Sequence, residues 1–238
     1  MNRWPAHSIR LWINGLLLII LWLVLSSAKA ASIQFGGVLP GGAVISKQVV
    51  SMREGRYIDV MQQETDFSCG AAALGTILKY AYGRSVTEPE VVKGMLKVSD
   101  PVLARERGFS LLDIKRYVET LGMRGRGYRI KYDDLERIRI PTIVLLDIRG
   151  YKHFVVLKAT TGAKVYLADP ALGNKSMDRA DFEKGWNGIV FAVIGQGFER
   201  NTVLLDKKEP PTVRRTRLEA PLSDSELYEF GFRHADLF

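Results

Sequence analysis

The chain has 238 residues, of which 47% are hydrophobic and 25% charged, and its formal net charge is +8. These averages are typical of a globular protein and exclude a wholly disordered chain or a collagen-like fibre. A single cysteine excludes an intramolecular disulfide and any zinc site built from two CxxC pairs. The length suits one domain with short appendages.

Residues 1–30 are typical of an export signal. An apolar run at 11–25 follows a basic start and leads to the A-x-A sequence that ends at Ala30. We therefore predict a secretory signal peptide, cleaved after Ala30, and a periplasmic mature protein. An uncleaved membrane anchor is the alternative, although fifteen residues at ~1.5 Å each cover roughly 22 Å of a ~30 Å hydrocarbon core.

Removal of this signal changes the charge of the chain. Residues 1–30 contain Arg3, Arg10 and Lys29 and no acidic residue, so the charge of +8 falls by three to +5. No cluster of basic and aromatic residues accompanies the remaining charge, and we expect no nucleic-acid partner. The histidines and the cysteine that remain lie far apart in the sequence, so no metal site is expected.

Three regions are expected after the signal: an extended lead-in at 31–56, one domain at 57–205 and a charged tail at 206–238. Two Gly-Gly pairs at 36–37 and 41–42 favour a flexible lead-in, with self-processing there as the alternative. Apolar spacing and capping signals in the domain predict helices at 69–82, 87–97, 111–121, 133–135 and 176–186. β-Rich runs predict strands at 142–148, 153–159, 164–168 and 188–194. Helices followed by antiparallel strands make an α+β domain.

Cys69 is the candidate nucleophile. It stands where a loop becomes a helix, in the sequence QETDFSCG of residues 63–70. A helix N-terminus stabilises a thiolate, and the amide of Cys69 can point at a developing oxyanion. A buried structural thiol is the alternative, since free cysteines are common in protein cores. A free thiol in an exported protein is at risk of oxidation, however, which favours a functional role.

His153 and Asp169 are the candidate partners of the thiol. His153 opens the run HFVVLKA, and Asp169 ends the run KVYLAD sixteen residues later. A carboxylate on a neighbouring antiparallel strand can hold an imidazole in the tautomer that accepts a thiol proton. Together with Cys69 they match the geometry of a cysteine hydrolase. Asp147, in the middle of an apolar run, is an alternative orienting carboxylate.

Four motifs at these spacings resemble one known family. Gln63 lies six residues before Cys69, residues 66–74 read DFSCGAAAL, His153 lies in GYKHFVV, and Asp169 lies in ADPALG. Together they resemble the bacteriocin-processing, double-glycine cysteine peptidases, the thirty-ninth family of cysteine peptidases, over residues 62–193. The resemblance implies a papain-like fold, with N-terminal helices packed on an antiparallel sheet.

The resemblance also implies the roles of single residues. Cys69 would be the nucleophile, His153 the general base and Asp169 its orienting carboxylate, with the side chain of Gln63 in the oxyanion hole. The family needs no cofactor, and its members typically cut a leader peptide after a Gly-Gly pair.

The best-known members are fused to an ABC exporter, whereas neither a multi-span region nor a Walker motif follows here. The chain therefore resembles the stand-alone exported members, which include peptidases encoded beside functional-amyloid (Fap) secretion systems. We expect a peptidase acting on a polypeptide such as an amyloid or secretion-system protein. A thiol amidase or transpeptidase with the same triad and a non-catalytic, peptide-binding adaptor are the alternatives.

Overall fold

The computed structural model describes residues 32–35, 45–48, 51–148 and 150–207. The expected signal peptide, both Gly-Gly pairs and all but two residues of the expected tail lie outside these ranges. Within them, no helix combines the length and the apolar composition needed to cross a membrane.

The lead-in is partly regular. Strands β1 (Ser32–Phe35) and β2 (Ile45–Gln48) pair with each other in antiparallel fashion. Helix α2 (Met52–Arg56) follows as part of a separate unit, so the extended conformation expected up to residue 56 is wrong at its end. A capping box explains the helix, because Ser51 and Glu54 each accept a hydrogen bond from the main-chain amide of the other.

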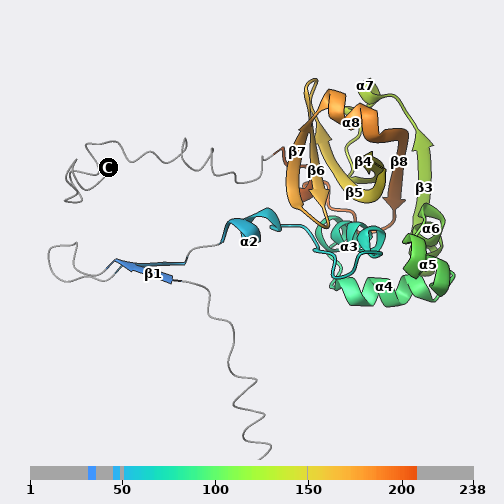
Figure 1. The fold of residues 1–238 in the computed structure, drawn as a ribbon, viewed down its shortest axis with the longest axis horizontal. Helices are drawn as coiled ribbons and strands as arrows, with labels where there is room; N and C mark the ends of the chain where they lie inside the picture. Colours follow the sequence, from blue (N-terminus) through green and yellow to red (C-terminus); the bar gives the residue numbers. More distant parts are fainter. Residues whose placement is uncertain (1–31, 36–44, 49–50, 149, 208–238) are drawn as a thin grey trace, which may run out of the picture. The chain divides into compact units, whose positions relative to one another are not determined.

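Four longer helices come before the main sheet (Figure 1): α3 (Cys69–Tyr82), α4 (Glu88–Leu96), α5 (Pro101–Arg107) and α6 (Leu111–Thr120). The helices predicted at 69–82, 87–97 and 111–121 are confirmed by α3, α4 and α6. Helix α5 was not predicted, yet it has a cap, since a carboxylate oxygen of Asp100 accepts from the amides of Val102 and Leu103.

Six strands among the described residues form one antiparallel sheet in the order β3-β8-β4-β5-β6-β7. Their bounds are β3 (Arg124–Arg129), β4 (Thr142–Ile148), β5 (Tyr151–Thr160), β6 (Lys164–Asp169), β7 (Gly173–Asp178) and β8 (Trp186–Ile194). Short helices α7 (Tyr132–Leu135) and α8 (Arg179–Gly185) and the 3₁₀ turn η1 (Val203–Leu205) complete this unit. The predicted α+β class is confirmed.

The two edge strands are absent from the sequence prediction. The helix predicted at 176–186 is wrong at its start, because residues 173–178 pair with β6 and the helix begins at Arg179. Strand β3 reads RGRGYR and is largely exposed. Edge strands with so few apolar side chains lack the alternation on which strand prediction depends.

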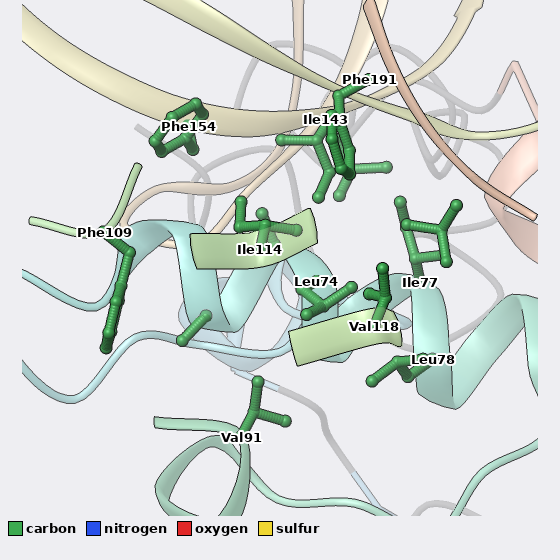
Figure 2. Close-up of a cluster of buried hydrophobic side chains, with 14 of the residues drawn as sticks. Leu74, Ile77, Leu78, Val91, Phe109, Ile114, Val118, Ile143, Phe154 and Phe191 are labelled. Atoms are coloured by element: carbon green, nitrogen blue, oxygen red, sulfur yellow. The ribbon is translucent and has the colours of Figure 1, made fainter. Parts of the chain in front are cut away.

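Apolar side chains fill both faces of the sheet. On one face, α3 contributes Leu74 and Ile77 and α6 contributes Ile114, which pack with Ile143 and Phe154 of the sheet (Figure 2). On the other, α7 and α8 cover a second cluster that includes Tyr132 and Phe182. The first cluster fixes α3 against β5, and the close packing of these two elements sets the position of the first residue of α3.

Candidate active site

Cys69 is the first residue of α3 and is 7% exposed. The residue before it does not cap the helix with its side chain, because Ser68 Oγ instead donates to the carbonyl of Thr65 at 2.9 Å. The side chain of Ser68 therefore does not occupy the N–H groups at the positive end of the helix. Gly70 follows because the space is limited: a Cβ there would lie 3.3 Å from the Phe154 ring.

His153 and Asp169 form a buried pair. His153 lies near the start of β5 and Asp169 at the end of β6, and Nε2 of the imidazole is 2.7 Å from Oδ1 of the carboxylate. The residues are 4% and 0% exposed. The other ring nitrogen, Nδ1, is buried and makes no hydrogen bond of standard geometry to the described residues. This nitrogen is therefore the one available to a thiol proton.

The pair is charged at neutral pH. Burial, the largest single effect, lowers the pKa of His153, but Asp169 and the neighbouring Cys69 outweigh it and raise the pKa from 6.5 to about 9. Burial likewise raises the pKa of Asp169, and His153 together with Lys175 overcomes it and lowers the pKa from 3.8 to about 2. The imidazolium carries a proton on each ring nitrogen, so Nδ1 can donate its proton while Nε2 stays bound to Asp169.

Asp169 has further partners that the sequence analysis missed. Its Oδ1 also accepts hydrogen bonds from the amides of Ala171 and Leu172, at 2.9 and 3.2 Å. Its Oδ2 lies 2.6 Å from Nζ of Lys175 on β7. No sequence signal pointed to Lys175, because strand β7 itself was not predicted.

Gln63, the predicted oxyanion-hole residue, lies on the segment that leads to Cys69. Its main-chain amide donates to the carbonyl of Pro170 at 3.0 Å, which joins this segment to the turn after Asp169. Its side-chain Nε2 donates to the carbonyl of Thr65 at 3.2 Å, and its Oε1 is buried without a hydrogen-bond partner in the described part of the chain. Gln63 thus lies in the same region as the other candidates, and its side-chain amide is hydrogen-bonded to the nearby main chain of Thr65.

Two neighbours complete the surroundings of the imidazole. Tyr151, 57% exposed, stacks on His153 with ring centroids 5.7 Å apart and planes inclined by 25°. Asp147, the alternative orienting carboxylate, is exposed, and its Oδ1 accepts the amide of Gly150 at 2.9 Å in the β4–β5 turn. The structure places Asp169, not Asp147, against the imidazole.

Fold and site together define a papain-like cysteine peptidase, with a thiol at a helix N-terminus and a histidine–carboxylate pair on adjacent strands. Residues 57–196 match the model of the Peptidase C39 family, and the chain belongs to that family. Relatives are similar over almost the whole chain. "Probable functional amyloid protease FapD" of Pseudomonas aeruginosa is 55% identical over 94% of this chain and 99% of its own.

Two further comparisons agree with this assignment. A protein of the same name from Pseudomonas fluorescens is 50% identical over 92% of this chain and 97% of its own. Among solved structures, the peptidase domain of Streptococcus ComA, a bi-functional ABC transporter involved in a quorum-sensing pathway, is 20% identical with a TM-score of 0.50. The match covers 58% of this chain and 98% of that domain, and it shows a similarity of fold alone.

Proposed function

We propose that Cys69, His153 and Asp169 form the catalytic triad of this peptidase and that its substrate is a polypeptide of a functional-amyloid secretion system. The observation that supports the triad is the buried pair of His153 and Asp169, in which Nε2 and Oδ1 are 2.7 Å apart. Asp169 and Cys69 both stabilise the imidazolium form of His153. The likeness to the FapD proteases over nearly their full length supports the class of substrate. The apolar run at 11–25 supports export to the periplasm.

The first half of the reaction uses the proton on His153 Nδ1. The Cys69 thiolate attacks the scissile carbonyl carbon, a carbon–sulfur bond forms, and the carbonyl electrons move to oxygen. Amides at the start of α3 and the side chain of Gln63 stabilise this oxyanion; Gln63 reaches it by exchanging its bond to Thr65. As the intermediate collapses, the carbon–nitrogen bond breaks and the imidazolium proton passes to the leaving amine.

The second half regenerates the Cys69 thiolate and the His153 imidazolium. A water molecule attacks the thioester carbon, and His153 Nδ1 takes one of its protons. The carbon–sulfur bond then breaks, releasing the new carboxyl terminus and the thiolate. Asp169 holds the ring through Nε2 during both halves, so Nδ1 always faces the thiol.

The experiment compares the full chain with the variants Cys69→Ala and His153→Ala. Each is incubated with the amyloid subunit from the same organism, and the fragments are identified by mass spectrometry. We expect cleavage by the wild type alone. Cleavage by the Cys69→Ala chain would exclude the triad. The wild type could also produce no fragments although iodoacetamide alkylates its Cys69 rapidly. That result would exclude the proposed substrate and leave the reactive thiol in place.

A further inference from the structure

We propose that Lys175 is a positioning residue of this site, a fourth member that holds the carboxylate of Asp169 from the side opposite to His153. Lys175 Nζ lies 2.6 Å from Oδ2, while His153 Nε2 lies 2.7 Å from Oδ1. Each carboxylate oxygen therefore has its own cation. This inference rests on the proposed function, in which Asp169 orients the general base.

The burial of Asp169 makes the second cation necessary. The carboxylate side chain is 0% exposed, so a charge on it has no access to water. A buried ionised carboxylate is costly unless every lone pair is matched by a donor or a cation. Two main-chain amides and His153 satisfy Oδ1, whereas Lys175 is the cation that reaches Oδ2.

The place of Lys175 in the sheet explains how it reaches the site. On β7 it pairs with Leu167 of β6, two residues before Asp169. Its side chain is 22% exposed, so part of the lysine remains in contact with solvent while its ammonium lies against the buried carboxylate. The two contacts together fix the plane of the carboxylate, because rotating it out of this plane would break the ion pair with Lys175 and the hydrogen bond with His153.

Four titratable groups face Asp169 and bear on its ionisation. His153 and Lys175 lower its pKa. Burial is the largest cause of the raised pKa values of Tyr57 and Tyr151, and the negative charge of Asp169 adds to it. Of these, only Lys175 is a cation that takes no part in proton transfer. Its removal should let Asp169 take up a proton at higher pH, and a neutral Asp169 no longer supports the imidazolium.

The test follows the alkylation rate of Cys69 by iodoacetamide against pH, in the full chain and in Lys175→Met. We expect the acidic limb of the profile to move up by about 1 to 3 pH units in K175M. Lys175→Arg keeps the cation, so the acidic limb of its profile should lie at the same pH as in the wild type. Lys184→Met is the matched control, since Lys184 pairs with Asp181 at 3.2 Å with both side chains largely exposed.

A double-mutant cycle separates positioning from a structural role. If Lys175 acts through Asp169, K175M should leave the limb unchanged in an Asp169→Asn background. An unmoved limb in K175M, or an equal loss of rate at all pH values, would overturn the inference. If circular dichroism shows that K175M does not fold, the K175R variant is used instead. An acidic limb that moves to higher pH in K175R would overturn the inference. Peptide cleavage by the Cys69→Ala chain would instead overturn the proposed function.

Discussion

Gly173, the first residue of β7, packs directly against the main-chain carbonyl of Arg56. Gly173 has a φ of +80°, and a Cβ at this position would lie 2.5 Å from the oxygen of Arg56. The next residue strengthens the contact, because the side-chain amide of Asn174 donates to the carbonyls of Arg56 and Ile58, at 3.1 and 2.7 Å. The segment at residues 56–58 therefore packs against the start of β7, the strand that pairs with the end of β6 where Asp169 lies.

This contact makes Gly173→Ala a destabilising change. The new methyl group needs both a left-handed backbone and the displacement of Arg56, and we expect a loss of about 2 to 4 kcal/mol in the free energy of unfolding. Urea denaturation measures it. Gly162→Ala is the control, since a Cβ there would meet nothing within 4 Å. Equal stability of the two variants would contradict the proposed packing.

Asp169→Asn should lower activity without unfolding the chain. The amide keeps the shape of the carboxylate but not its charge, so the imidazolium of His153 loses its main support. We expect kcat/KM for peptide cleavage to fall by about 10² to 10⁴. The control is Asp147→Asn, because Asp147 is exposed at the end of β4. A loss of similar size in the control would remove the special role of Asp169.

Gln63 and its neighbour Gln62 offer a matched pair for the oxyanion hole. Gln63 is partly buried with an unpartnered Oε1, whereas Gln62 is exposed. If the Gln63 amide donates to the oxyanion, Gln63→Ala should lower kcat by about 10² to 10³ with little change in KM. Gln62→Ala should match the wild type. A change confined to KM in Gln63→Ala would indicate substrate binding instead.

Much of the architecture could be predicted because its signals are local. Capping residues such as Ser110 with Asp113 mark where α6 begins, and the structure contains that capping box. The apolar stripe of α3 predicted the same bounds, 69–82, that the structure has. The central strands are apolar runs bounded by turns, and strand prediction works best on such runs.

The parts that escaped prediction depend on contacts between distant residues. Strand β3 contains Gly125 because the Phe191 ring lies 2.5 Å from where its Cβ would be, which no local pattern reveals. Lys175 reaches Asp169 only once β7 pairs with β6. The pairing of His153 with Asp169 was predicted from strand order, whereas the ion pair with Lys175 requires the register of an unpredicted strand.

The buried pair also predicts how stability depends on pH. The pKa of His153 is raised from 6.5 to about 9, so its contribution to folding is fully present below pH 6.5 and is lost as the pH rises towards 9. The pKa of Asp169 is lowered from 3.8 to about 2, so its contribution is present above pH 3.8 and is lost as the pH falls towards 2. The contribution of this pair to stability is therefore greatest between pH 3.8 and pH 6.5.

Urea denaturation at pH 6 and pH 9.5 tests the alkaline side of this dependence. The wild-type chain should lose up to about 3 kcal/mol between the two pH values through His153 alone. His153→Gln removes the titrating ring, and its loss over the same interval should be smaller by that amount. Parallel curves for the two chains would mean that folding does not raise the pKa of His153, and the imidazolium that the mechanism needs would then be lost as the pH rises above 6.5.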